Sequence, residues 1–208
     1  MSSLRQILAH HQRVLLVDTC SARIQVGWLE SNETALWATS DKEAGIGLFE
    51  SVASLRKSPS DAGAFVFCDG PGSLLGIRTA AMALRTWSTL AARPTFAYHS
   101  LDLVAHSASH RNSCVIADAR RDSWHCTSTL SKLTRVPTTK LSGDLVMPEG
   151  FRNWTPLPPG VRTATYVIQD FFAELMDADL LRPTDAPDAY LHEEPSYVTW
   201  TPRIHRAP

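Results

Sequence analysis

Apolar and polar positions alternate along the first forty residues in the way that strands require. Residues 14–18 form an apolar run that ends in an aspartate, residues 23–30 alternate with a period of two, and residues 35–40 form a third run. Short polar turns separate the three runs. The pattern predicts three consecutive strands joined as an antiparallel meander.

The period changes from residue 42 onward. Apolar side chains then recur every three or four positions as far as residue 55, which predicts a helix. A strand at 64–68, an alanine-rich helix at 77–91 and a strand at 95–98 follow. Three strands followed by helix, strand, helix and strand is an order that resembles one ribonuclease H-like half, the building block of actin-like and sugar-kinase folds.

A second half repeats the start of the first. After a helix predicted at 101–109, the apolar run 114–118 again ends in an aspartate, and residues 123–130 form the returning strand. Two strand-ending aspartates, Asp18 and Asp118, mark this weak internal duplication.

We therefore predict an α/β protein with two lobes, each a mixed sheet flanked by helices. Residues 1–110 make the first lobe, with 1–13 as a flexible extension, and 111–208 make a smaller, divergent second lobe. Residues 134–161 carry five prolines and little periodicity, so no regular structure is predicted there.

The end of the chain returns to recognisable patterns. A strand is predicted at 161–168 and a helix at 170–181, and the proline-rich tail from residue 182 is expected to lie along the surface.

The amino-acid composition argues against several classes of protein. The chain has 208 residues, 44% of them hydrophobic, so it can bury a core. Twenty basic residues face twenty-one acidic ones, which argues against a protein that grips nucleic acid on its own. The polar start lacks the core of a signal peptide, and no apolar run approaches the ~20 residues that span a bilayer, so we expect a cytoplasmic protein without membrane contact.

The cysteines show no metal-binding spacing. None of the four forms a CxxC pair, so we expect reduced structural thiols and no metal site. The cysteines are Cys20, Cys68, Cys114 and Cys126.

A glycine-rich turn at 69–78 is the strongest local signal. Its glycines allow a tight turn, Ser73 is a candidate N-cap, and a helix N-terminus can hold an anion. Leu75 stands where a dinucleotide fingerprint would have its third glycine, and no Lys-Ser or Lys-Thr pair completes a P-loop. Two interpretations stay open: a strand-to-helix turn that needs glycine for its geometry, or a vestigial phosphate site. The candidate residues of that site are Asp18, Gly70, Gly72, Ser73, Gly76, Arg78 and Asp118.

These motifs resemble the TsaB (YeaZ) family in order and spacing. The resemblance rests on residues 14–19, on Asp69-Gly70-Pro71-Gly72-Ser73-Leu74-Leu75-Gly76-Ile77-Arg78, on 116–120, and on the Tyr190-Leu191 pair near the carboxyl end. It implies the ASKHA (actin-like, sugar-kinase, heat-shock ATPase) fold. It also implies a noncatalytic subunit, without a cofactor, of the complex that forms N6-threonylcarbamoyladenosine at position 37 of tRNAs that read codons starting with A.

The resemblance further implies partners. The chain would bind the catalytic subunit TsaD, be joined by the ATPase TsaE and touch tRNA only indirectly. Without a partner, an exposed apolar helix face would support a homodimer, because such faces seldom stay uncovered. The pairing would use the helices at 42–56 and 77–92. The residues expected at this interface are Ile46, Phe49, Val52, Ile77, Ala80, Ala81 and Leu84.

The sequence departs from the family pattern in two places. Leu74 and Leu75 replace a phenylalanine and a threonine of the glycine turn, and Ala44 lies near a position that is usually histidine. The two metal-binding histidines of the catalytic relatives align with Ser100 and Val104, neither of which can replace a neutral imidazole.

Two enzymatic hypotheses remain as alternatives to the noncatalytic role. A phosphotransferase or ATPase of the same fold would hold magnesium at Asp18 or Asp118 and phosphates at Gly70 to Gly76. A metallopeptidase would rest on His106 and His110, which form an HxxxH pair that a helix would place on one face.

Overall fold

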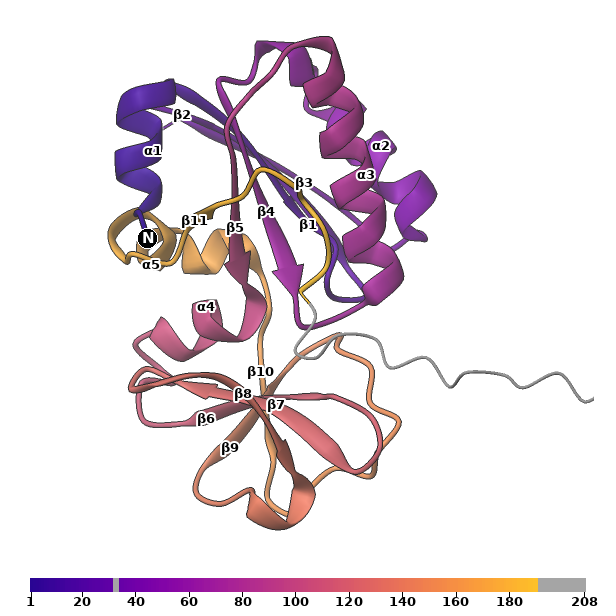
Figure 1. The fold of residues 1–208 in the computed structure, drawn as a ribbon, viewed down its shortest axis with the longest axis vertical. Helices are drawn as coiled ribbons and strands as arrows, with labels where there is room; N and C mark the ends of the chain where they lie inside the picture. The colour runs from indigo at the N-terminus through magenta and orange to yellow at the C-terminus, as the bar shows by residue number, and fades with distance from the viewer. Residues whose placement is uncertain (32–33, 191–208) are drawn as a thin grey trace, which may run out of the picture.

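The computed structural model describes residues 1–31 and 34–190, which form two mixed sheets stacked along the long axis of the molecule (Figure 1). The first sheet has the strand order β11-β5-β4-β1-β2-β3, and the second has the order β10-β9-β6-β7-β8. The strands of the first sheet are β1 (Arg13–Asp18), β2 (Ile24–Glu30), β3 (Ala35–Ser40), β4 (Ala64–Gly70), β5 (Thr95–His99) and β11 (Arg182–Pro183). Those of the second are β6 (Cys114–Asp118), β7 (Ser123–Ser128), β8 (Ser131–Pro137), β9 (Leu145–Pro148) and β10 (Arg162–Ala164).

The two sheets repeat one topology, which confirms the duplication. In the first, β1, β2 and β3 form the predicted antiparallel meander, while β4 and β5 continue parallel to β1. In the second, β6, β7 and β8 form the meander, and β9 and β10 continue parallel to β6. Since β1 and β6 hold equivalent places, Asp18 and Asp118 end equivalent strands.

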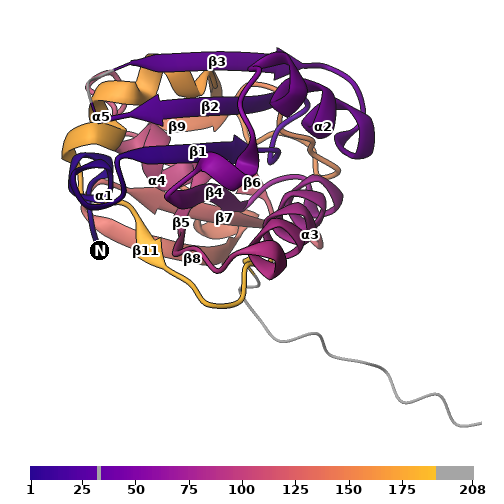
Figure 2. The ribbon, with the colours of Figure 1, turned by 90° about the horizontal axis from the view of Figure 1, so that it is seen from above.

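Helices surround the first sheet on both faces (Figures 1 and 2). The long helices α2 and α3 cover one face, and α1 and α5 lie on the other. Helix α4 lies between the sheets and packs on β4 and β5 of one and on β6 and β7 of the other. The helices are α1 (Leu4–His11), α2 (Ala44–Ser54), α3 (Leu74–Leu90), α4 (Ser100–His106) and α5 (Phe172–Asp177), with single 3-10 turns at Pro59–Asp61, Thr138–Lys140 and Ile168–Phe171.

The amino terminus is ordered, so the prediction of a flexible extension at 1–13 was wrong. Ser3 caps α1 through a reciprocal pair of hydrogen bonds with Gln6, which forms a capping box. Leu4, Ile7 and Leu8 of this helix are buried, and α1 packs against α5. The first residues therefore belong to the core of the first lobe.

The carboxyl-terminal part of the chain also returns to the first lobe. The helix predicted at 170–181 is shorter, because a 3-10 turn precedes α5 and extended chain follows it. The residues after it do not simply follow the surface, since Arg182 and Pro183 pair with Ala97 and Phe96 of β5 and extend the first sheet. The predicted Tyr190-Leu191 motif is described only as far as Tyr190, and Leu191 lies outside the described residues.

Residues 134–161 are more regular than the sequence indicated. They include the end of β8, a 3-10 turn and all of β9, although the chain from 149 to 161 has no helix or strand. The helices that connect parallel strands in the first lobe have no counterpart here. The second lobe is smaller because its strands are joined by short irregular segments.

Two of the four cysteines are paired, which corrects the prediction of reduced thiols throughout. Cys114 on β6 and Cys126 on β7 form a disulfide, with their Cα atoms 6.3 Å apart. Cys20 and Cys68 are free thiols in the core of the first lobe. None of the helices in the described residues has the length and apolar character needed to cross a membrane.

Candidate functional site

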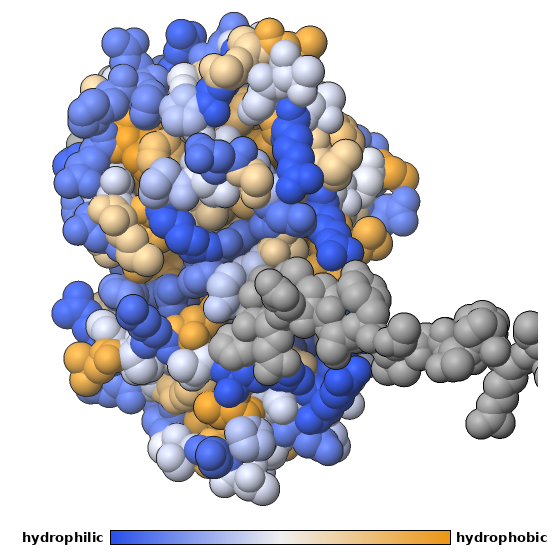
Figure 3. Space-filling view, viewed as in Figure 1, coloured by the Kyte–Doolittle hydropathy of each residue, from blue (hydrophilic) through white to orange (hydrophobic). Residues whose placement is uncertain are grey.

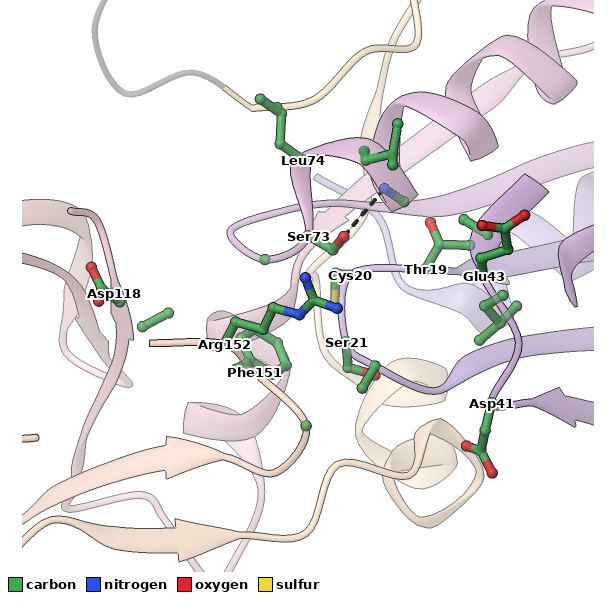
Figure 4. Close-up of a pocket in the computed structure, with 18 of the residues that line it drawn as sticks. Thr19, Cys20, Ser21, Asp41, Glu43, Ser73, Leu74, Asp118, Phe151 and Arg152 are labelled. Carbon is green, nitrogen blue, oxygen red and sulfur yellow. Dashed lines mark hydrogen bonds between the residues drawn. The ribbon is translucent and has the colours of Figure 1, made fainter. Parts of the chain in front are cut away.

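A cavity of about 590 Å³ opens between the two lobes, where β1, β4 and β6 end (Figure 4). Its first-lobe wall consists of the β1–β2 turn and the first turns of α2 and α3. Its second-lobe wall consists of Ala117 to Arg120 and the segment Gly150 to Trp154. Of the residues predicted for a phosphate site, four line this cavity and three do not. Gly72, Ser73, Gly76 and Asp118 line it, whereas Asp18, Gly70 and Arg78 lie elsewhere.

The glycines of the turn are explained by close packing. A Cβ atom at Gly72 would collide with the carbonyl oxygen of Cys20, and one at Gly76 would collide with that of Thr19. Gly70 has a φ of +115°, which other residues rarely adopt. The first turn of α3 thus lies directly on the β1–β2 turn, and this close approach needs glycine whether or not an anion binds.

Ser73 caps α3 as predicted. Its side chain accepts a hydrogen bond from the Gly76 amide at 3.3 Å, drawn as the dashed line in Figure 4. Its own amide donates to the Cys20 carbonyl at 2.7 Å. The cap therefore uses part of the hydrogen-bonding capacity that a phosphate would need.

Asp18 is fully buried, and it is hydrogen-bonded both to the first lobe and to the segment that follows the second lobe. It accepts hydrogen bonds from the hydroxyls of Tyr98 at 2.6 Å and Tyr166 at 2.7 Å, and from the Cys20 amide at 3.1 Å. Burial, followed by the nearby Asp18 charge, raises the pKa of both tyrosines well above the usual value, so their hydroxyls stay protonated as donors. Asp18 thus ties β1 to β5 and to the segment after β10.

Asp118 is held in a comparable way by the backbone. Its carboxylate accepts hydrogen bonds from the amides of Arg120 at 2.5 Å, Trp154 at 2.5 Å and Thr155 at 2.6 Å. Burial opposes its ionisation, but these backbone donors outweigh burial and lower the pKa of Asp118. The carboxylate holds the segment around Trp154 against the β6–β7 turn.

Arg78 points to the carboxyl-terminal segment and away from the turn. Arg78 and Arg85 on α3 lie 4.0 and 3.4 Å from the Asp188 carboxylate. Asp69, at the end of β4, pairs with Arg182 and accepts at 3.0 Å from His99, and its carbonyl accepts from the Tyr190 amide at 2.7 Å. The charges around the glycine turn therefore fasten the end of the described chain to the first lobe.

The second-lobe wall supplies residues that the sequence did not indicate. Figure 4 shows Arg152 extending across the cavity toward Cys20 and Ser21 of the β1–β2 turn. Within the described residues, Arg152 forms no hydrogen bond or ion pair. Beside it, the Arg120 guanidinium lies 4.2 Å from the ring centre of the half-exposed Trp154. The cavity wall carries three basic side chains, Lys42, Arg120 and Arg152, and three acidic ones, Asp41, Glu43 and Asp118. Arg152 lies in the aperiodic segment, where no sequence signal pointed to it, whereas Arg120 belongs to the 116–120 motif.

The HxxxH pair does not form a metal site. Helix α4 ends at His106, so His110 lies beyond the helix and the two rings do not share a helical face. His106 Nδ1 lies 2.8 Å from the Asp102 carbonyl oxygen, and burial together with Arg162 lowers the pKa of His110. In the described part of the chain, the only group of three metal-ligating residues is Asp18, Cys20 and Cys68.

The helix face predicted as a partner interface is partly core. Five of its seven predicted residues are at most 7% exposed and pack within their own lobe, so they cannot make direct contact with a partner. These are Val52, Ile77, Ala80, Ala81 and Leu84. The other two, Ile46 and Phe49, are about half exposed.

Further apolar side chains are exposed beside these two. Leu74, Leu75 and Met82 of α3 are 46%, 77% and 58% exposed. Together with Ile46 and Phe49, they form what we name the α2–α3 face. Apolar surface is visible at the edge of the molecule over these helices (Figure 3). The sequence located the helices correctly, but the residues it predicted on α3 face the core of the lobe.

The two lobes with duplicated sheets and an interlobe cavity define an ASKHA-like fold. No family model matches the chain, and no curated protein resembles it in sequence. Among solved structures, the chain is similar to YeaZ from Pseudomonas aeruginosa, with 19% identity and a TM-score of 0.59 over 78% of this chain and 90% of that one. It is also similar to an uncharacterised protein with similarity to peptidase YeaZ from the same organism, with 20% identity and a TM-score of 0.57 over 75% and 85% of the two chains. The chain therefore has the YeaZ fold.

Proposed function

We propose that this chain is a noncatalytic member of the TsaB (YeaZ) family. It serves as a partner subunit of the complex that forms N6-threonylcarbamoyladenosine at position 37 of tRNA, binding a TsaD homologue and, through it, a TsaE homologue. The likeness to YeaZ structures and the motifs at 14–19, 69–78 and 116–120 support this assignment.

The observation that carries the noncatalytic role is the state of the two strand-end aspartates. In a phosphotransferase of this fold, these carboxylates would position magnesium and the attacking group. Here each accepts three hydrogen bonds from the protein. The space beside the glycines that would cradle phosphate is occupied by the β1–β2 turn. This arrangement favours a role in binding over one in nucleotide chemistry.

The α2–α3 face supports the partner role. Exposed apolar side chains that cluster on two adjacent helices are typical of a surface that another protein covers. Phe49 is the best anchor, because its ring is held edge-on by Trp87 at a centroid distance of 6.3 Å and is still about half exposed. A second copy of the chain would use the same face when no other partner is present.

Reconstitution tests the proposal directly. The chain is mixed with the TsaD and TsaE homologues of its own cell, and the modified nucleoside is measured in tRNA with and without the chain. Phe49→Asp should weaken binding to the TsaD homologue at least tenfold in a titration and reduce modification in parallel. Glu50→Ala, one position further along and turned to Lys42, serves as the control.

Two results would contradict the proposal. Modification that proceeds equally well without the chain would remove the role in this complex. Turnover of ATP with magnesium by the chain alone, lost in Asp118→Asn, would instead establish the phosphotransferase or ATPase hypothesis.

A further inference from the structure

Three metal-ligating side chains meet in the core behind the β1–β2 turn. A carboxylate oxygen of Asp18 and the sulfur atoms of Cys20 and Cys68 all lie within 4.8 Å of one another. Asp18 and Cys20 come from the end of β1 and the residues after it, and Cys68 comes from the neighbouring strand β4. All three are at most 1% exposed. Cys20 also lines the interlobe cavity, so the cluster lies directly behind the cavity wall.

The charge of this cluster is uncompensated. Among the described residues, no lysine, arginine or histidine forms an ion pair with Asp18. Its three hydrogen-bond donors, two tyrosine hydroxyls and one backbone amide, are neutral groups. A buried carboxylate without a cation is costly even when it is hydrogen-bonded. A bound cation would remove this cost.

The hydrogen bonds leave room for such a cation at one oxygen. Asp18 Oδ2 accepts from both tyrosines, but Oδ1 accepts only from the Cys20 amide. A carboxylate oxygen has about two lone-pair sites, so Oδ1 has one left. Asp18 Oδ1 accepts this hydrogen bond from Cys20, which also carries one of the two sulfur atoms.

We propose that Asp18, Cys20 and Cys68 form a structural zinc site. Two sulfurs and one oxygen suit Zn²⁺, which prefers four ligands in tetrahedral geometry. The hydroxyl oxygen of Tyr166, 3.3 Å from Cys20 Sγ, is a neighbouring oxygen for the fourth position. Binding converts both thiols to thiolates, so two protons leave for solvent as each Zn²⁺ enters. The ion would fasten the β1–β2 turn to β4 behind the cavity.

The test uses the full chain, reduced and stripped with a chelator, and the metals alone as probes. Titration with Co²⁺ should give a thiolate-to-cobalt charge-transfer band that saturates at one equivalent, and Zn²⁺ should displace it with the release of two protons. Cys20→Ser and Cys68→Ser should each lose the band. The double variant Cys114→Ser/Cys126→Ser, which removes the other cysteine pair, should keep it.

A readout on the unaltered protein keeps the proposal falsifiable if the single variants do not fold. Alkylation mapped by mass spectrometry should label Cys20 and Cys68 in the partly unfolded apo-protein and spare them when Zn²⁺ is present. Absence of a stoichiometric band, or a band that persists in both single variants, would overturn the proposal. So would a reduced protein that binds no metal and only forms a Cys20–Cys68 disulfide on oxidation.

Discussion

The first turn of α3 provides a sharp test of why the glycine motif exists. Gly76→Ala adds one methyl group where the carbonyl oxygen of Thr19 already lies. Because the obstacle is backbone, it cannot rotate away as a flexible side chain would. Overpacking of this kind costs about 1–3 kcal/mol.

The matched control is Gly45→Ala. Gly45 is the second residue of α2, as Gly76 is the third residue of α3, but no atom lies within 4 Å of a Cβ built there. Alanine is better than glycine in a helix by about 0.5–1 kcal/mol, so Gly45→Ala should stabilise the protein by that amount. The same gain partly offsets the collision at Gly76, which leaves a net loss of up to about 2.5 kcal/mol.

Thermal unfolding followed by circular dichroism separates the two variants. For a chain of this length, 1 kcal/mol shifts the melting temperature by about 2–4 °C. Gly76→Ala should therefore melt up to about 10 °C below the parent protein, and Gly45→Ala should melt slightly above it. If both variants were equally stabilised, close packing would not explain Gly76, and the vestigial phosphate site would be the better interpretation.

Three further predictions concern single side chains. Tyr166→Phe removes one of the three donors to buried Asp18 and should lower the free energy of unfolding by about 1–3 kcal/mol in urea titrations. The pKa of Asp118 is lowered in the folded protein, so its contribution to stability is present above its ordinary value of 3.8 and is lost as the pH falls through the folded value. Asp118→Asn should accordingly lower the melting temperature at pH 7 but converge with the parent protein in acid, and a constant difference across a pH series would refute this account. Leu8→Ala should cost about 2–5 kcal/mol because Leu8 is buried, whereas Ala9→Ser on the exposed side should stay within about 0.5 kcal/mol; equal effects would contradict the packing of α1.

Strand and helix periods predicted most of the first lobe, because its elements are regular and long enough to repeat. The strands β1 to β5 and the helices α2 and α3 lie where the pattern placed them, apart from shifts of a few residues at their ends. The sequence pattern did not predict helix α1, because this helix has only two turns and three buried residues. Its capping box, Ser3 with Gln6, was the signal that could have revealed it.

The sequence predicted residues on the first-lobe wall of the cavity but few on the second-lobe wall, for a physical reason. Turn glycines and strand-end aspartates leave a local pattern, and the cavity wall of the first lobe consists of such residues. The opposite wall is held by Asp118 through amides 36 and 37 positions away, a long-range contact that no local period encodes. The sequence also could not predict which side of α3 is buried, because that depends on which side packs on the sheet. Small alanines are suited both to a partner interface and to the core of the lobe. Four cysteines allow three pairings, so the Cys114–Cys126 bond could not be chosen from spacing.

The two strand-end aspartates connect the proposed binding role with the proposed zinc site. Each uses three of its roughly four lone-pair sites on protein donors, which leaves too few for a hydrated magnesium ion and a substrate. At Asp118, the backbone donors occupy both oxygens at the mouth of an open cavity. Asp18 belongs to a buried cluster with two thiols, where a cation with sulfur affinity is favoured over magnesium. The proposed noncatalytic role and the proposed zinc site are thus compatible, because both rest on carboxylates that are hydrogen-bonded to the protein itself.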